Sequence, residues 1–131
     1  SKSLNNTILL TEEADILKKK IKTMITDTKR QRKTDAGDPN VCPVFDYHKV
    51  FSTDEERAKI IEGCTKAEIG CIECKQILVN NVENFICPIR EKKKALDKEI
   101  HDIDEFLAPS QKKANDFAAA LMEKVRKAIK I

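Results

Sequence analysis

The sequence predicts an all-α protein, a helical bundle of five or six helices. The chain has only 3 Gly and 4 Pro in 131 residues, too few turn-forming residues for a β-sandwich or barrel. Its composition, 40% hydrophobic and 36% charged, suits amphipathic helices around one modest core. Apolar residues also recur at spacings of three and four in several segments, which is the period of a helix that buries one face.

The first helix is expected over residues 12–27. Thr11 can cap its start, and three acidic residues fill its first turn, where they suit the positive end of the helix dipole. Leu17, Ile21 and Met24 then fall on one face. These features together predict one amphipathic helix.

A basic loop should follow over residues 28–40, because the apolar periodicity stops there and turn-forming residues take over. Aromatic residues then indicate a short helix near residues 44–51. The string Ser52-Thr53-Asp54-Glu55 is interpreted as a capping box that starts the next helix, and Gly63 is expected to stop it.

The second half of the chain is also predicted to be helical. A long helix should run from residue 71 to 97, with Pro88 inside it, and a short one should cover residues 101–107. Pro109-Ser110 is expected to end that element and to cap a C-terminal helix over 111–131. The side chains predicted to be buried are Leu17, Ile21, Met24, Leu78, Val82, Phe85, Leu121 and Val125.

Charge is distributed unevenly along the chain. Residues 1–34 carry a net charge of +5 and residues 111–131 carry +4, whereas residues 35–110 carry −6, which together give the net +3. Because +3 is too little for a protein that coats nucleic acid along its length, any RNA contact should be local. No apolar run approaches the roughly 20 residues of a membrane span, and no secretory signal or glycine-rich phosphate loop is present.

Four of the five cysteines form a spaced set, C-x21-C-x6-C-x2-C, made of Cys42, Cys64, Cys71 and Cys74. Two thiols in a CxxC pair at a helix start can converge on one point, where the helix dipole favours the thiolate. This pattern predicts a metal site. One alternative is disulfides, which the lack of a secretion signal disfavours. The other is inert buried thiols.

The other two candidate ligands are interpreted as structural. Cys87 lies outside the spacing and should only pack, and His48 should sit at a helix surface. The spacing leaves the metal open, because zinc usually takes two close ligand pairs and uneven cysteine runs also serve iron–sulfur clusters.

The start of the chain and several later segments resemble a known protein family. The opening Ser1-Lys2-Ser3-Leu4-Asn5-Asn6-Thr7-Ile8 looks like the tail of the KMSKS signature of class I aminoacyl-tRNA synthetases. Together with Gly37-Asp38-Pro39-Asn40-Val41-Cys42-Pro43-Val44, Ile89-Arg90 and the cysteine spacing, the whole chain resembles bacterial tryptophanyl-tRNA synthetases. Because the chain starts inside that motif, we expect it to be a piece of something longer.

The resemblance implies a domain plan and a function. Residues 1–10 would be the tail of the KMSKS loop, and residues 11–131 a helical anticodon-binding domain with a metal site at 42–74. The parent would be a cytoplasmic, homodimeric, ATP-dependent ligase that attaches tryptophan to its tRNA. The chain alone lacks the N-terminal catalytic domain that it would contact, so it should be non-catalytic and can be monomeric.

Specific residue roles follow from the same resemblance. Lys2 would match a catalytic lysine of the parent, and Ser1, Lys2 and Ser3 would bind ATP there. The four cysteines would hold a [4Fe-4S] cluster, with zinc as the alternative occupant. Cations beside this site are the expected contacts to the anticodon region of tRNA(Trp): Lys29, Arg30, Arg32, Lys33, Lys66 and Lys75. The competing hypothesis is an iron–sulfur redox protein or a zinc-binding interaction protein.

Overall fold

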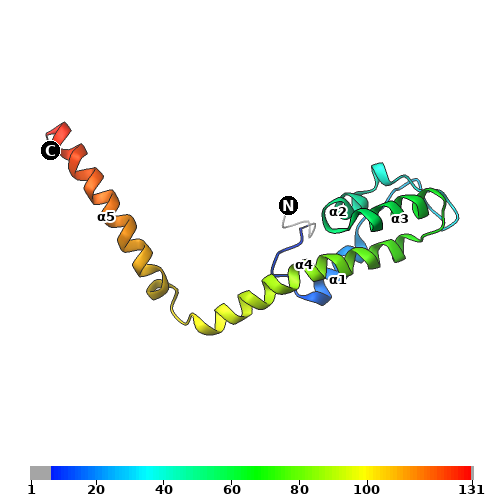
Figure 1. Cartoon of the computed structure of the whole chain (residues 1–131), viewed down its shortest axis with the longest axis horizontal. Helices are drawn as coiled ribbons and strands as arrows, with labels where there is room; N and C mark the ends of the chain where they lie inside the picture. The colour runs from blue at the N-terminus through cyan, green and yellow to red at the C-terminus, as the bar shows by residue number, and fades with distance from the viewer. Residues whose placement is uncertain (1–6, 131) are drawn as a thin grey trace. The chain divides into compact units, whose positions relative to one another are not determined.

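The structure is a computed structural model, and it describes residues 7–130. Within that range every regular element is helical, which confirms the all-α prediction (Figure 1). Five α-helices and one 3-10 turn follow one another along the chain: α1 (Ala14–Thr23), η2 (Pro39–Val41), α2 (Pro43–Phe51), α3 (Asp54–Thr65), α4 (Cys71–Glu99) and α5 (Ile103–Ile129). None of these helices is long and apolar enough to cross a membrane.

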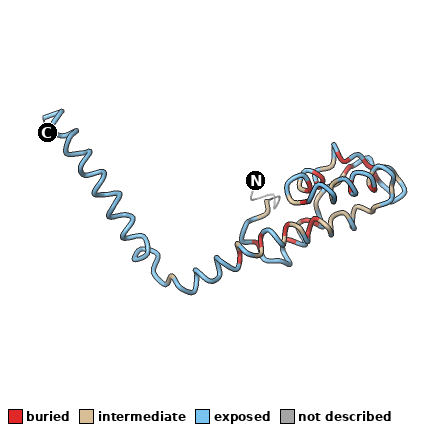
Figure 2. Tube along the Cα trace, in the orientation of Figure 1, coloured by how far each residue is buried: buried red, intermediate tan, exposed pale blue. Residues whose placement is uncertain are grey.

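The chain divides into two compact units, one ending at Lys93 and the other beginning at Lys94. The first unit holds the whole buried core. In Figure 2 the buried positions of the described chain all lie within it, whereas the second unit is exposed along nearly its entire length. All of the predicted site residues that the structure describes belong to the first unit.

The core of the first unit forms where α1 and α2 pack against α4. Seven buried side chains make one cluster: Leu17, Ile21, Val44, Leu78, Val79, Val82 and Ile86. Each fully buried aliphatic side chain contributes about 1.5–3 kcal/mol through removal of its surface from water. Burial of Leu17, Ile21, Leu78 and Val82 was predicted from helical spacing and is confirmed; Met24 is only partly buried against the cluster.

Three of the predicted core residues are exposed. Phe85 is 53% exposed and reaches the ring of Phe51 edge-on, with 5.4 Å between the ring centroids. Leu121 and Val125 are 54% and 39% exposed, since α5 has no buried residue within the described chain. Helical periodicity shows that a face is apolar, but burial also requires a facing element.

The first helix is shorter than predicted. It begins at Ala14, after Glu13, and Thr11 lies in the preceding turn rather than at the cap. Glu12 closes that turn with a bond from its N–H to the carbonyl of Leu9 at 3.0 Å. The helix ends at Thr23 because Met24 is already extended, with ψ at 142°.

The capping box before α3 is confirmed, but Gly63 does not end that helix. Thr53 accepts from the Glu56 N–H, and the Glu56 side chain accepts from the Thr53 N–H. The helix continues to Thr65, and Gly63 is buried instead, where an added Cβ would lie 3.1 Å from the Ile69 side chain. Gly63 therefore allows α3 to pack closely against Ile69 and does not terminate the helix.

The C-terminal helix is one element, not two. It starts at Ile103, because the side chain of Asp102 accepts hydrogen bonds from the N–H groups of Asp104 and Glu105. The helix then runs through Pro109, so the predicted break at Pro109-Ser110 is wrong. Proline removes one backbone donor from a helix interior, which costs stability without forcing the helix to stop.

Candidate functional site

The four cysteines of the spaced set converge in the first unit. Cys42 precedes α2, Cys64 lies in the last turn of α3, and Cys71 and Cys74 lie in the first turn of α4. All four are free and partly buried. They lie close enough for the charge of three of them, Cys42, Cys64 and Cys71, to act on the fourth.

The electrostatics of these thiols depend strongly on burial. Burial raises the pKa of Cys74 to about 12, and the neighbouring thiols add to the shift. Burial also raises the pKa of Cys64, and there the cation of Arg30 works in the opposite direction. The thiolate forms of Cys64 and Cys74 are therefore unfavourable at neutral pH unless a cationic centre offsets their charge.

Among residues 7–130, no group of three or more His, Cys, Asp or Glu side chains is arranged to hold a single metal ion. The zinc alternative thus has no supporting geometry in the described chain. A single tetrahedral ion draws its four ligands around one centre, whereas a cubane cluster attaches each thiolate to a different iron.

Arg30 turns inward, although it was predicted to be a tRNA contact. It is 9% exposed, and its Nη2 donates to the carbonyls of Lys33 and Ile69, both at 2.8 Å. Its Nη1 lies 3.7 Å from Cys64 Sγ, and its Nε is buried without a hydrogen-bond partner. The guanidinium therefore joins the basic loop to the cysteine-bearing loop.

A glycine gives Cys64 the space that it occupies. An added Cβ at Gly37 would lie 2.6 Å from Cys64 Sγ, closer than side-chain carbons approach a neighbour. The Gly37 N–H also donates to the Cys64 carbonyl at 3.0 Å. The loop over residues 28–40 thus lies against the end of α3.

Asp27 holds the basic loop, a role that the sequence analysis missed. Its two carboxylate oxygens accept from the N–H groups of Asp38 at 3.0 Å and Lys29 at 2.9 Å. These bonds lower the pKa of Asp27, the Asp38 bond having the larger effect. Its position just before a basic, turn-forming string is the signal that could have identified it.

The other cations predicted to contact tRNA differ in whether their side chains are exposed and already engaged by other groups. Lys29, Arg32 and Lys33 are exposed in the loop. Lys66 is exposed but pairs with Glu62 at 2.6 Å. The Nζ of Lys75 donates to the carbonyls of Lys22 and Met24 at 2.9 and 2.6 Å, and so caps the end of α1.

A groove of about 680 Å³ lies between the basic loop and the start of α4. Arg32 and Lys33 line one side, and the first turn of α4 lines the other, where its free N–H groups carry partial positive charge. Its full lining is Thr26, Arg30, Gln31, Arg32, Lys33, Gly70, Cys71, Ile72, Glu73 and Gln76. The groove offers cations, amide groups, the Glu73 carboxylate and the apolar side chain of Ile72 to a ligand.

His48 is fully buried, so its predicted place at a helix surface is wrong. Its Nε2 lies 3.3 Å from Cys74 Sγ, and its Nδ1 lies 2.7 Å from Ser52 Oγ. Burial lowers the pKa of His48. Helical spacing alone could have shown that His48 shares a face with Val44. Cys87 is partly buried on α4.

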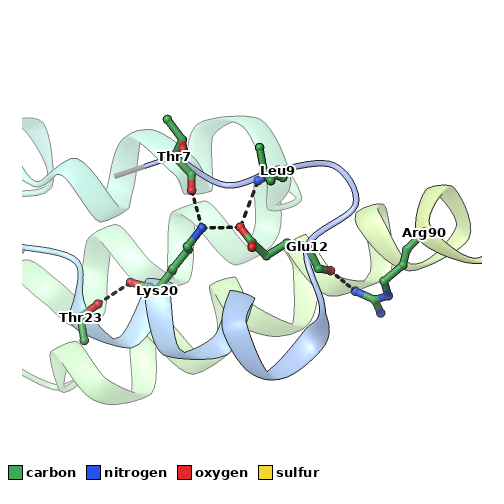
Figure 3. A network of polar contacts seen from close by, with 6 residues as sticks. All are labelled: Thr7, Leu9, Glu12, Lys20, Thr23 and Arg90. Carbon is green, nitrogen blue, oxygen red and sulfur yellow. Dashed lines mark hydrogen bonds and ion pairs between the residues drawn. The ribbon is translucent and has the colours of Figure 1, made fainter. Parts of the chain in front are cut away.

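The segment that follows the KMSKS-like start is tied to the helices by polar contacts (Figure 3). The Nζ of Lys20 donates to the Thr7 carbonyl at 2.9 Å and to the Glu12 carboxylate at 2.5 Å. Arg90 of α4 donates to the Glu12 carbonyl at 2.6 Å. Ser1, Lys2 and Ser3, the predicted ATP and catalytic positions, lie outside the described residues.

Similarity to known proteins covers the whole chain. The tryptophan–tRNA ligase of Aquifex aeolicus is 42% identical over 132 residues, and that of Thermotoga maritima is 40% identical over 132 residues. Both alignments cover 100% of this chain, which spans 33% and 40% of the length of those relatives.

Fold comparison agrees with the sequence comparison. The crystal structure of tryptophanyl-tRNA synthetase from Campylobacter jejuni matches with a TM-score of 0.84 and 27% identity, over 100% of this chain and 42% of that one. The competing redox or zinc-binding hypothesis finds no support in these matches. Residues 1–87 also match the family described as tRNA synthetases class I (W and Y). The chain therefore belongs to the class I tRNA synthetases of the tryptophan and tyrosine type.

Proposed function

We propose that this chain is the anticodon-recognition part of a tryptophan–tRNA ligase. The parent enzyme would use ATP to attach tryptophan to tRNA(Trp) in the cytoplasm, as a homodimer whose catalytic domain contacts this chain. The observation that carries the anticodon role is the groove between the basic loop and α4, with Arg32 and Lys33 on its wall.

The groove suits an unstacked anticodon base next to its phosphates. Lys29, Arg32 and Lys33 supply exposed cations for the backbone. Gln31 and Gln76 supply amide groups for base edges. None of the side chains that line the groove is aromatic, so recognition relies on edge hydrogen bonds and on stacking against arginine. Lys66, after α3, is a further exposed cation, whereas Arg30 and Lys75 use their donors on backbone carbonyls.

In the parent, the KMSKS-like start would serve the other substrate. Lys2 would stabilise charge that develops on the pyrophosphate of ATP, with Ser1 and Ser3 as hydrogen-bond donors. The contacts of Thr7 and Glu12 with Lys20 would anchor that loop to the helical region (Figure 3).

We propose further that Cys42, Cys64, Cys71 and Cys74 hold a [4Fe-4S] cluster. Two observations favour this group: Cys42, Cys64 and Cys71 lie close enough for their charge to act on Cys74, and the buried Nε of Arg30, whose Nη1 faces Cys64, lacks a hydrogen-bond partner. The Arg30 guanidinium supplies both a positive charge and an unused N–H donor, and both suit an anionic cluster whose sulfides accept hydrogen bonds. When bound, the cluster supplies a structural cross-link between the loops and α4.

The tRNA assignment is tested by titrating an anticodon stem-loop of tRNA(Trp) against the triple variant Lys29→Ala/Arg32→Ala/Lys33→Ala. We expect weaker binding and a slope of log affinity against log salt that is shallower by about 2, since each single-strand phosphate contact contributes about 0.7. The matched control changes Lys112, Lys113 and Lys124 of α5 to Ala. Equal loss in both variants would show a non-specific charge effect and contradict the groove assignment.

The cluster assignment is tested by iron and sulfide analysis after anaerobic purification. Cys71→Ser should abolish iron binding, whereas Cys87→Ser should leave it unchanged, because Cys87 lies outside the spaced set of four cysteines. Equal iron loss in the Cys87 variant would contradict the choice of ligands. Stoichiometric zinc without sulfide would contradict the cluster.

A further inference from the structure

A chain of hydrogen bonds runs from Cys74 into the protein interior, and neither tRNA binding nor the cysteine ligands account for it. His48 has no exposed surface and lies between two partners. Its Nε2 is 3.3 Å from Cys74 Sγ, and its Nδ1 is 2.7 Å from Ser52 Oγ. Ser52 is itself only 9% exposed. A buried imidazole with both nitrogens engaged is held in one orientation.

Glu56, at the end of this hydrogen-bond series away from Cys74, determines which groups donate and which accept. Glu56 is held by the capping box, where its Oε2 accepts from the Thr53 N–H at 3.1 Å. The same oxygen accepts from Asn81 Nδ2 at 2.8 Å. Because an ionised carboxylate only accepts, the amide of Asn81 must present its NH₂ group on this side. Its second hydrogen points to Ser52 Oγ at 2.9 Å.

The donor and acceptor roles of Asn81 in turn fix those of Ser52 and of the His48 imidazole. With its oxygen already accepting from Asn81, the Ser52 hydroxyl has one hydrogen to donate, and His48 Nδ1 is its partner at 2.7 Å. A neutral imidazole whose Nδ1 accepts carries its hydrogen on Nε2. That hydrogen faces Cys74.

We propose that His48 is a positioning residue that donates its Nε2–H to the Cys74 thiolate, with Ser52, Asn81 and Glu56 selecting the tautomer. This inference rests on the proposed cluster, in which a ligating thiolate can only accept. Hydrogen bonds to the sulfurs orient the ligands of an iron–sulfur cluster and tune its reduction potential. Cys74 thus receives a neutral donor, whereas Cys64 faces the Arg30 cation at 3.7 Å.

The tautomer is testable without any metal. In the ¹⁵N-labelled metal-free chain, long-range ¹H–¹⁵N spectra should show His48 protonated on Nε2 only, and the exposed His101 serves as an internal reference. Ser52→Ala removes the donor to Nδ1 and should produce a mixture of tautomers. A His48 protonated on Nδ1 in the wild-type chain would overturn the proposal.

The effect on the cluster is tested in the reconstituted chain. His48→Leu should weaken the affinity of the site for iron by about tenfold, the lower end of the range for outer-shell partners, so that a chelator removes the iron faster. It should also lower the reduction potential. His48→Gln retains an N–H donor and should restore most of both properties, while His101→Gln should change neither. Ser52→Ala should shift both properties in the same direction as His48→Leu, by less.

The outcomes separate this inference from the cluster assignment. A wild-type chain that takes up no iron and sulfide overturns the cluster and, with it, the role of His48. A loaded wild-type chain whose chelation rate and potential are unchanged by His48→Leu overturns the role of His48 alone. Circular dichroism checks the fold of each variant. If His48→Leu does not fold, the Ser52→Ala result decides the question, because it leaves the imidazole in place.

Discussion

Ala67 occupies a backbone position that normally belongs to glycine. Its φ of 59° is left-handed, and the N–H groups of Glu68 and Ala67 donate to the carbonyls of Gly63 and Cys64 at 2.7 and 3.3 Å. This is the Schellman arrangement that ends α3. The termination of α3 therefore depends on a strained alanine two residues beyond Thr65.

Replacing Ala67 by Gly should stabilise the protein. The left-handed conformation costs an alanine about 1–2 kcal/mol, and part of that gain is offset by the extra freedom of glycine in the unfolded chain. We expect an increase of about 0.5–1 kcal/mol in the free energy of unfolding, measured by urea denaturation. Ala58→Gly, in the exposed interior of α3, is the matched control and should destabilise by about 1 kcal/mol. Destabilisation by Ala67→Gly would contradict the assigned strain.

Glu12 makes the stability of the first unit sensitive to acid. The hydrogen bond from Lys20 lowers the pKa of Glu12 below its ordinary value of 4.5. A carboxylate whose pKa is lowered by folding stabilises the folded state above its unfolded pKa, and this contribution disappears as pH falls through the lowered value.

Glu12→Gln should therefore reduce stability at neutral pH and flatten its acid dependence below about pH 4.5. We expect a loss of about 1–2 kcal/mol at pH 7, in line with hydrogen bonds to charged groups. Thermal unfolding followed between pH 3 and 7 measures both effects. Asp116→Asn changes an exposed carboxylate of α5 and should leave the profile unchanged. A variant with the wild-type acid dependence would show that Glu12 is not the responsible group.

At the scale of the elements, the basic loop keeps its shape through backbone bonds to acidic side chains. Asp27 accepts at both oxygens, and Asp35 Oδ2 accepts from the Arg32 N–H at 2.7 Å. The cations that face the solvent are thus presented by a loop whose own carboxylates are occupied. Arg30 ties the same loop to the segment before α4.

Asp27→Asn should loosen this loop while leaving the helices intact. The amide replaces one acceptor oxygen by a donor, which then faces a backbone N–H. We expect trypsin to cleave after Lys29 and Arg32 several times faster than in the wild-type chain, with an unchanged helical circular dichroism signal. Asp46→Asn, at an exposed carboxylate of α2, is the control. An unchanged cleavage rate would contradict the role assigned to Asp27.

At the scale of the whole molecule, the proposed cluster and the helical core stabilise different parts. The segment between Cys64 and Cys74 is short of buried apolar side chains, since its Ile72 is 82% exposed. The core cluster of α1, α2 and α4 contains no residue of that segment except the partly buried Cys74 at its end. Metal binding would therefore contribute folding energy mainly to the loops.

Metal removal should consequently loosen one region selectively. In Cys74→Ser, or after chelation of the loaded chain, amide hydrogen exchange should accelerate in the loops over residues 28–42 and 64–74. It should remain slow at Leu78, Val82 and Ile86, which the core buries. Global unfolding on metal loss would contradict this division. Full affinity of the metal-free protein for the anticodon stem-loop would show that the cross-link is dispensable for recognition.

Local patterns in the sequence were sufficient for the helices and for much of the core. The spacing of Leu17 and Ile21, the Thr53–Glu56 box and the cysteine spacing depend on neighbours within a few turns, and the structure agrees with the helices, the box and the buried residues that they predicted. The resemblance to tryptophanyl-tRNA synthetases also came from the sequence, and the comparisons confirm the family.

Only the tertiary structure decided which side chains are covered and which are free to bind. Burial of Arg30, and exposure of Phe85 and Leu121, depend on contacts between distant segments, which no local spacing encodes. Arg30 and Lys75 carry the same charge as their exposed neighbours, yet backbone carbonyls from other segments use their donors. The periodicity of α5 marks an apolar face but cannot supply the element that would bury it.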